Sequence, residues 1–251
     1  MKPDEQRLHQ QLKAMKLRFI RDNYPTLVEQ AAREQWPPLE LLVRLIEGEA
    51  HYRADNALRR RLKAARFPVL KTLDTFDWSW PRKINRPLIQ DLFRLAWVPE
   101  HGNVIFLGGV GQGKTHLASA LAYAACLEGY TVLFTTAIEV IQTLGAAQAA
   151  HRFRAELKRF IKPHVLVLDE LGYLPIDKAG ADLLFQVVSQ RYECGAMILT
   201  TNTPFKQWPG LFNNDSTLAS ALLDRLLHHA CNVVIDAKSY RMKDRTREEP
   251  Q

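Results

Sequence analysis

Residues 108–115 read GGVGQGKT, so four glycines precede a lysine and a threonine. Glycines let successive backbone N–H groups point inward around phosphate oxygens, where a side chain would occupy the phosphate's place. The lysine of such a loop neutralises the β- and γ-phosphates, and the threonine hydroxyl is a ligand for Mg²⁺. The spacing G-x-x-x-x-G-K-[ST], between a predicted strand and a predicted helix, favours a triphosphate site over a glycine-rich turn with a chance lysine. The residues expected to bind the nucleotide are Gly108, Gly109, Val110, Gly111, Gln112, Gly113, Lys114, Thr115 and His116.

An acidic pair, Asp169 and Glu170, ends the strand-like run HVLVLDE. An aspartate at the carboxyl edge of a parallel sheet can hold Mg²⁺ together with Thr115, and the adjacent glutamate can polarise the attacking water. We therefore expect ATP and Mg²⁺ as ligands, with Thr115 and Asp169 at the metal. A water-activating carboxylate also favours hydrolysis over phosphoryl transfer to a small metabolite.

Two more residues could complete a hydrolytic site. The run AMILTTN brings Asn202 to the same sheet edge, where it could hold the attacking water. Thr200 or Thr201 could serve instead, and a strand-end cap is the plainer interpretation. The helix-like run ASALLDRLLHHA carries Arg225, which either pairs with Asp224 on the surface or enters a neighbouring subunit's site as an arginine finger. We interpret Asn202 and Arg225 as catalytic, together with the strand-end glutamate.

Short β-rich runs and helical stretches alternate in the second half of the chain and must position these groups. The strand candidates are NVIFL, TVLFTT, HVLVLDE, AMILTTN and NVVID. Between them we expect helices at Lys114–Glu128, Lys178–Glu193 and Leu218–Ala230, and a helical region from Ala137 through Phe160. Buried parallel strands have this texture, so the pattern predicts a three-layer α/β domain with right-handed crossovers.

The first hundred residues are different in character. Two sets of apolar residues recur at helical spacing, namely Leu8, Leu12, Met15 and Phe19, and Leu39, Leu42, Val43 and Ile46. They predict two amphipathic helices, and a third is expected over Ala54–Ala65. Pro68 and the stretch TLDTFDWSWPRKINRP then predict a linker, whose Trp78 and Trp80 we expect to pin it to the neighbouring domain rather than to stack on bases. The predicted domains are 1–70, helical and binding DNA or a partner; 71–100, a linker and entry segment; and 101–251, which binds nucleotide.

Composition narrows the class of protein. The 251 residues are 47% hydrophobic, enough for a packed core. No apolar run is long enough to cross a bilayer and the polar N-terminus cannot form a signal-peptide core, so we expect a cytoplasmic protein with no membrane partner. The three cysteines, Cys126, Cys194 and Cys231, support neither a disulfide framework nor a zinc site and are interpreted as small core residues.

The net charge of +7 is concentrated in the first part of the chain. Residues 1–100 contain 19 Lys and Arg against 13 Asp and Glu. Within the run HYRADNALRRRLKAARFPVLK, the residues we expect to contact nucleic acid are Arg59, Arg60, Arg61 and Lys63. Such a run can be a solvated helix face, but it also suits binding to a phosphate backbone.

Taken together, these motifs resemble the IstB-type transposition helper ATPases, AAA+ proteins akin to the DnaC-type helicase loaders. The resemblance covers most of the chain, and its restrictive parts are DELGYLP, DRLLH and the terminal SYR. It implies an α/β P-loop NTPase core of the AAA+ type, with a parallel five-stranded sheet of order 5-1-4-3-2 and a small all-α N-terminal domain. It further implies ATP-dependent self-assembly around duplex DNA, with ATP at subunit interfaces, and a partner transposase encoded in the same insertion sequence.

The resemblance implies a role for each site residue of this chain. Lys114 and Thr115 would be Walker-A ligands, Asp169 and Glu170 Walker-B acids, Asn202 sensor 1 and Arg225 the finger acting in trans. Two departures qualify the resemblance. About fifteen residues follow NVVID, too few for a C-terminal helical lid with a sensor 2, a role that Arg241 could fill. The fourth strand ends in TTN, where a serine was expected before the asparagine.

The resemblance also draws attention to HRFRAELKRFIKP, which lies just before the Walker-B strand. Positions 154 and 158 are one helical turn apart, so a basic ridge is geometrically available. Its residues expected to contact DNA phosphates, in preference to forming a solvated face, are Arg152, Arg154, Lys158 and Arg159.

The sequence therefore predicts an ATP-dependent AAA+ ATPase that assembles on double-stranded DNA, largely without sequence preference, and helps a transposase. A replicative helicase loader and a nucleotide-gated DNA-binding protein with negligible turnover are the alternatives. A small-molecule P-loop kinase is the least favoured, because the acidic pair suits water activation.

Overall fold

The computed structural model describes residues 3–81 and 83–240. The chain divides into two compact units, Met1–Arg60 and Arg61–Gln251. This division falls ten residues before the boundary predicted near residue 70. The reason is that residues 61–70 already pack on the second unit: Arg61 Nε donates to the carbonyl of Cys126 (3.0 Å), and Ser119 Oγ donates to the carbonyl of Val69 (2.9 Å).

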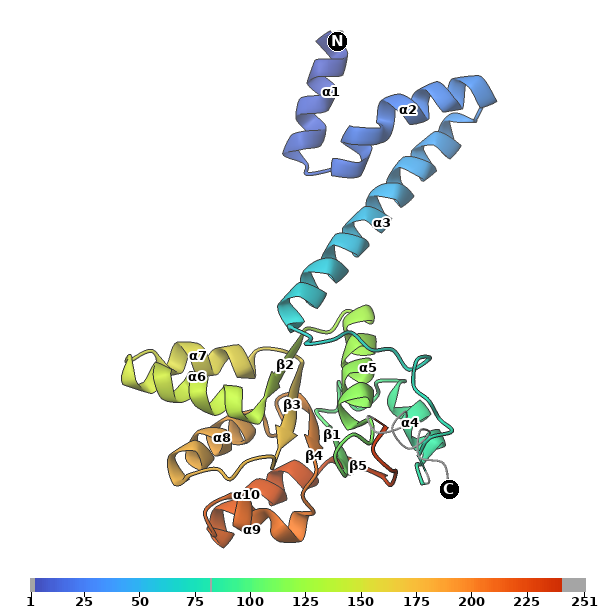
Figure 1. The fold of residues 1–251 in the computed structure, drawn as a ribbon. Coiled ribbons are helices and arrows are strands. Elements are labelled where there is room, and N and C mark those ends of the chain that lie inside the picture. Colours follow the sequence, from blue (N-terminus) through green and yellow to red (C-terminus); the bar gives the residue numbers. More distant parts are fainter. Residues whose placement is uncertain (1–2, 82, 241–251) are drawn as a thin grey trace, which may run out of the picture. The chain divides into compact units, whose positions relative to one another are not determined.

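The first unit consists of helices only, and their limits differ from the predicted ones. They are α1 (Pro3–Ala14), α2 (Arg18–Glu34) and α3 (Pro38–Ala65), the last of which continues into the second unit (Figure 1). The helix expected through Phe19 is interrupted at Lys16, whose φ is 59°. The predicted second and third helices are one continuous helix, and α2, with Pro25 in its interior, was not predicted.

Glu49 is the polar centre of the contact between α2 and α3. It is only 5% exposed. Its Oε2 accepts from the backbone N–H of Ile20 (3.3 Å), and its Oε1 pairs with Arg53 (2.9 Å). Beside it, any side chain at Gly48 would collide with the ring of Phe19, so the glycine permits the close approach of the two helices.

The second predicted apolar stripe is not a buried one. Leu39 is 71% exposed, Leu42 55%, Val43 43% and Ile46 53%. Helical spacing gave the correct secondary structure here, because α3 includes all four residues. Spacing alone does not determine whether another element covers the stripe.

The second unit is built on a five-stranded parallel sheet of order β2-β3-β4-β1-β5, which confirms the predicted order 5-1-4-3-2. The strands are β1 (Asn103–Gly108), β2 (Val132–Thr136), β3 (Val165–Leu171), β4 (Ala196–Thr201) and β5 (Ala230–Ile235). In β1 to β4 almost every side chain is buried, since helices cover both faces of the sheet.

Helices on the two faces complete three layers (Figure 1). Helix α5 covers one face, and α6, α7, α8 and α10 cover the other, where they share a core with β2, β3 and β4 that includes Leu144, Leu184 and Trp208. The helices are α4 (Arg86–Leu92), α5 (Lys114–Leu127), α6 (Ala137–Ala149), α7 (Phe153–Ile161), α8 (Lys178–Arg191), α9 (Trp208–Leu211) and α10 (Ser216–Leu227), with a 3₁₀ turn at Phe205–Gln207.

The structure refines two helix predictions. The helical region predicted from Ala137 through Phe160 comprises two helices, because the chain turns at His151, whose φ is 53°, and so separates α6 from α7. The last predicted helix is shifted toward the N-terminus, since Asp215 caps α10 by accepting from the N–H of Leu218 (2.9 Å) and Ala230 already belongs to β5.

Cys126 is buried in α5 as expected, whereas Cys194 is exposed and Cys231 is half-buried. Arg241 lies outside the described residues. Among the described helices, none combines the length and the apolar character that crossing a bilayer requires.

Candidate functional site

A cavity of about 760 Å³ lies where β1, β2, β3 and β4 end and α5 begins. The strands are parallel, so their carboxyl ends deliver the loop after β1 and the acids of β3 to one place. The lining includes Gly111–His116, Asp169, Glu170 and Thr200. The nucleotide-binding and acidic motifs, which are more than fifty residues apart, therefore face the same space.

The loop between β1 and α5 has the shape of a phosphate cradle. Gly111 has φ 73° and Gly113 has φ 94°, a left-handed conformation that suits glycine. A Cβ on Gly113 would come within 2.9 Å of the Phe76 ring. The buried Lys114 places its Nζ 2.8 Å from the carbonyls of both Gly108 and Gly109, so its ammonium group lies over the loop.

Three polar side chains from three elements meet beside this loop. Thr115 Oγ1, at the start of α5, donates to Asp169 Oδ1 (3.1 Å), and Thr200 Oγ1 from β4 donates to the same oxygen. Asp169 is only 4% exposed. Hydroxyl and carboxylate oxygens are the donors that Mg²⁺ prefers, so Thr115 and Asp169 fit a magnesium ion on chemistry and proximity.

Glu170 differs from its neighbour in conformation and exposure. Its φ is 59°, which is uncommon for a residue other than glycine. Its N–H donates to Thr200 Oγ1 (3.0 Å), while its side chain is exposed at the cavity. The unusual backbone is therefore held by a hydrogen bond to the next strand, and the carboxylate is free to face solvent in the cavity.

At the end of β4, the polar residue that lines this cavity is Thr200, which was one of the alternatives to Asn202. Asn202 follows β4, and its Oδ1 accepts from Thr203 Oγ1 (3.1 Å). It is not among the cavity-lining residues of the described chain. Thr200 contacts both members of the acidic pair, a link that requires the register of β3 against β4 and that sequence spacing does not reveal.

Arg225 also lies away from this cavity. Its Nη1 donates to the carbonyl of Ala221 (3.0 Å), and its guanidinium lies 4.9 Å from the centre of the Phe185 ring on α8. No ion pair joins it to Asp224 among the pairs found in the described residues.

The stretch 66–81 forms a wall of the cavity that the motifs did not predict. His116 Nε2 lies within hydrogen-bond distance of the Thr72 carbonyl (3.0 Å) and Thr75 Oγ1 (3.2 Å), and its ring packs edge-on against Phe76. Burial lowers the pKa of His116, which keeps the imidazole neutral at pH 7. The side chain of His116 thus attaches this wall to α5.

Trp80 pins the same stretch to the end of the described chain, as expected. Its Nε1 donates to the Lys238 carbonyl (2.8 Å) and its ring packs edge-on against Tyr240. Tyr240 N–H in turn donates to the Gly111 carbonyl (2.9 Å). Gln112 adds a second connection, because its side chain bonds both Gly109 N–H and the Ala237 carbonyl. The loop is therefore braced from both sides.

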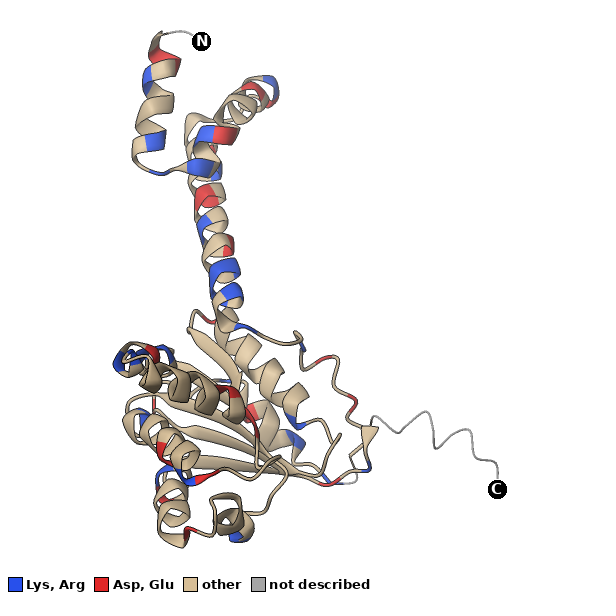
Figure 2. Cartoon of the chain, turned by 60° about the vertical axis from the view of Figure 1, so that its left-hand side comes forward, with Lys and Arg blue, Asp and Glu red and all other residues tan. Residues whose placement is uncertain are grey.

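The basic residues predicted to contact nucleic acid lie on two helices (Figure 2). On α7 and its N-cap, Arg152, Arg154 and Lys158 are exposed, whereas Arg159 is half-buried and pairs with Glu156 (3.7 Å). On α3, Arg59, Arg60 and Lys63 are exposed, and Arg61 is occupied by its bond to the Cys126 carbonyl. Arg159 and Arg61 therefore have structural partners, and Arg60 Nε donates to the carbonyl of Asn56 one turn earlier in α3 (3.2 Å).

Known proteins are similar to this chain in sequence and in fold. The family model described as "IstB-like ATP binding protein" matches residues 10–248. The chain is 39% identical over 234 residues to the ATP-binding protein of insertion sequence IS21 from Pseudomonas aeruginosa, covering 93% of this chain and 88% of that protein. It is 37% identical to the corresponding protein of IS232 from Bacillus thuringiensis subsp. berliner, covering 97% of each. Among solved structures, the DnaC helicase loader superposes with a TM-score of 0.52 at 23% identity, covering 66% of this chain and 96% of that one.

Proposed function

The chain belongs to the family of IstB-like ATP binding proteins, and from this we propose that it is an AAA+ ATPase that assembles on duplex DNA and assists a transposase. The observation that carries the proposal is the meeting of Lys114, Thr115, Asp169 and Glu170 around one cavity. The printed names of its relatives, ATP-binding proteins of insertion sequences, support the transposition context.

The roles of the cavity residues follow from their chemistry. Lys114 would bind the β- and γ-phosphates in place of the two loop carbonyls that it now contacts. Thr115 and Asp169 would hold Mg²⁺, which when bound would neutralise charge on the phosphate oxygens. Glu170 would accept a proton from the attacking water. Thr200 would keep the two acids in register, and Asn202 at the same sheet edge remains our proposed second contact to that water.

Arg225 is proposed to act on the ATP of a neighbouring subunit. It does not line the cavity of its own chain, and the aromatic ring of Phe185 supports its guanidinium on α10. A residue that acts across a heterologous interface makes hydrolysis depend on assembly. ATP bound between subunits would then favour the assembled form, and hydrolysis would release it.

Duplex DNA is proposed to lie against the basic residues, largely without regard to sequence. Phosphate contacts carry little sequence information, and lysine and arginine supply them. The exposed members Arg154 and Lys158 lie one turn apart on α7, which suits successive phosphates. The other proposed contacts are Arg59, Arg60, Arg61, Lys63, Arg152 and Arg159.

The test of this function is DNA binding with and without ATP. Lys114→Ala should weaken ATP binding by about tenfold or more, because it removes charge-assisted hydrogen bonds worth roughly 1.5–3 kcal/mol each. DNA binding by the variant should then no longer respond to ATP in a filter or anisotropy assay. Lys178→Ala, which removes an exposed lysine at the start of α8, is the matched control and should behave as the wild type. A Lys114 variant that assembles on DNA normally without nucleotide would contradict the proposed switch.

The contribution of α7 can be measured from the salt dependence of DNA binding. Each neutralised phosphate contributes about 0.9 to the slope of log affinity against log salt, so Arg154→Ala with Lys158→Ala should reduce that slope by about 1.8. Arg94→Ala with Lys206→Ala removes the same charge elsewhere on the second unit and should leave the slope nearly unchanged. An unaltered slope in the α7 variant would exclude this helix from the DNA contact.

A helicase loader is the second candidate, favoured by the superposition on the DnaC structure. Both functions use the same nucleotide site, so they differ in partner only. Purified transposase from the same insertion sequence and purified replicative helicase, each tested for ATP-dependent co-sedimentation with the protein, would distinguish them.

A further inference from the structure

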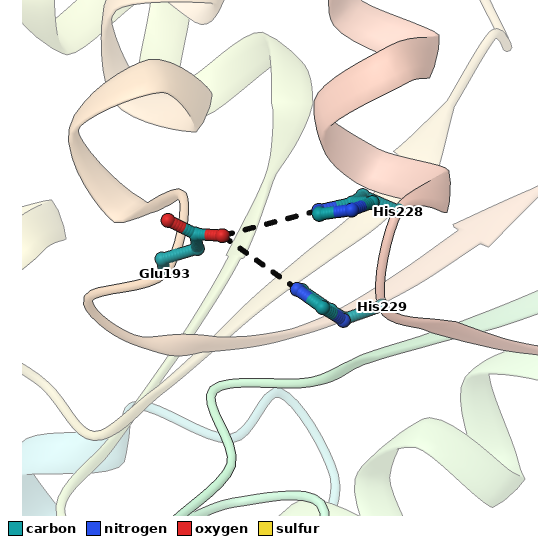
Figure 3. Close-up of side chains that lie close together, drawn as sticks. All are labelled: Glu193, His228 and His229. Atoms are coloured by element: carbon teal, nitrogen blue, oxygen red, sulfur yellow. Dashed lines mark ion pairs between the residues drawn. The ribbon is translucent and has the colours of Figure 1, made fainter.

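A second cluster of chemically capable side chains lies at the opposite edge of the sheet from the nucleotide cavity. Glu193 follows α8, just before β4, and His228 and His229 follow α10, just before β5. Glu193 Oε1 lies 4.0 Å from His228 Nδ1 and 3.7 Å from His229 Nε2 (Figure 3). One ligand atom from each of the three residues falls within 4.8 Å of the other two.

Backbone hydrogen bonds fix both segments that carry these side chains. The carbonyl of His229 accepts from the N–H of Asn103 at the start of β1 (2.8 Å), and Asn103 Nδ2 donates to the Leu226 carbonyl in α10 (3.0 Å). On the other side, the N–H groups of Cys194 and Gly195 donate to the Arg191 carbonyl (2.9 and 3.0 Å). Backbone hydrogen bonds therefore hold both segments in the positions that bring the three side chains together.

An ion pair alone is a poor account of this arrangement. The three side chains are each about half exposed, and exposed ion pairs contribute about 0–1 kcal/mol. The ring centroids of His228 and His229 are only 4.0 Å apart, so charging both would bring two cations together beside one carboxylate. Two neutral imidazoles and a carboxylate at this spacing are instead the donor set of a transition-metal site.

We propose that Glu193, His228 and His229 form a binding site for Zn²⁺. Zinc takes imidazole nitrogens at about 2.0–2.1 Å and carboxylate oxygens at about 2.0–2.2 Å, which separates tetrahedral ligands by roughly 3.3–3.6 Å. The separations of Glu193 Oε1 from the two imidazole nitrogens, 4.0 and 3.7 Å, are slightly longer than this, and rotation of the exposed side chains would shorten them and bring together the histidine nitrogens, which lie within 4.8 Å of each other. Tyr192, whose hydroxyl lies 2.7 Å from His228 Nδ1, would move aside to release that nitrogen. Exposure leaves the remaining coordination position to water.

The donor set selects the metal and defines the effect of binding. Imidazole ligands suit zinc, copper and nickel, whereas Mg²⁺ prefers oxygen ligands, so the site is chemically distinct from the one proposed at Thr115 and Asp169. A bound ion would join the end of α8 to the end of α10. The inference does not depend on ATP hydrolysis or DNA binding, since it concerns side chains outside that cavity.

Titration of the whole protein with ZnCl₂ in a calorimeter, without nucleotide or DNA, tests the site. We expect one equivalent to bind, and His228→Asn with His229→Asn to weaken that binding by at least about tenfold, because two of three ligands are lost. Glu193→Gln, on an exposed side chain, provides a second variant that should fold normally and also bind more weakly. His51→Asn with His101→Asn removes two exposed histidines elsewhere and should change nothing.

CoCl₂ provides a direct view of coordination, because Co²⁺ with inner-sphere imidazole and carboxylate ligands gives visible absorption that aqueous Co²⁺ lacks at comparable strength. The band should appear in the wild type and in the His51 and His101 variant, and be lost in the His228 and His229 variant. Circular dichroism confirms that each variant is folded. Absence of Zn²⁺ binding in the wild type, or equal binding in the variants at Glu193, His228 and His229, would overturn the proposal.

Discussion

Arg225→Ala is expected to lower ATP turnover by about 10³-fold or more, the range known for arginine fingers, while changing the affinity of the isolated chain for ATP little. The two effects separate because Arg225 lies on α10 against Phe185 and does not line the nucleotide cavity of its own chain. Phosphate release in the presence of duplex DNA measures the first effect, and binding of a fluorescent ATP analogue measures the second.

Mixing two inactive variants makes the test specific for action in trans. Arg225→Ala retains the nucleotide site, and Lys114→Ala retains the finger. In an equal mixture about a quarter of the heterologous interfaces combine both intact parts, so about a quarter of the wild-type rate should return. A variant that had merely unfolded could not be rescued in this way, and Arg94→Ala controls for loss of a surface arginine. Full activity in Arg225→Ala, or no recovery in the mixture, would contradict the assignment.

Glu170→Gln is expected to reduce ATP hydrolysis by about 10²- to 10⁴-fold, the usual contribution of a general base. The amide retains the size of the side chain, and the N–H bond to Thr200 does not involve the carboxylate. ATP should therefore still bind, and the assembly on DNA should persist, which sedimentation after ATP addition would detect.

Glu139→Gln is the matched control for this experiment. Glu139 also lines the cavity, but its Oε2 accepts a hydrogen bond from Thr135 Oγ1 (2.9 Å). This carboxylate is therefore less available than that of Glu170 to accept a proton from water. Its substitution should change the rate by less than about tenfold. Wild-type protein that released no phosphate with or without DNA would instead favour a nucleotide-gated binding protein.

The sequence predicted the sheet closely and the helical unit poorly, for a physical reason. Strands buried on both faces appear as compact apolar runs, and each of the five observed strands lies within two residues of its predicted run at either end. The order of the strands came from the family resemblance. In the helical unit, short apolar stripes predict separate helices, whereas α3 continues through the polar residues between them. Polar residues do not interrupt a helix when their helix propensity is adequate.

Within the candidate site, local motifs could likewise be predicted from the sequence, whereas contacts between distant residues could not. The loop at 108–115 and the acids at 169–170 were visible because their chemistry is contained in a few consecutive residues. Thr200 and the wall around Phe76 were not selected, since their roles arise from contacts with Asp169, Glu170 and His116 across separate elements. In the sequence, 34 residues lie between Glu193 and the histidine pair, so no short motif contains the proposed zinc ligands. Cysteine spacing gave no indication of them, because none of the three is a cysteine.

Arg191 determines how α7 is attached to the rest of its unit. The residue is 1% exposed, and its guanidinium donates to the carbonyls of Phe160, Ile161, Pro163, His164 and Ala196 (2.7–3.1 Å). Burial lowers the pKa of Arg191 to about 10, so it stays protonated at neutral pH. One cation thus fastens the last turn of α7 to the first residue of β4. Because β4 runs from that residue to Thr201 and includes Thr200, the contacts of Arg191 and those of the acidic pair lie at opposite ends of one buried strand.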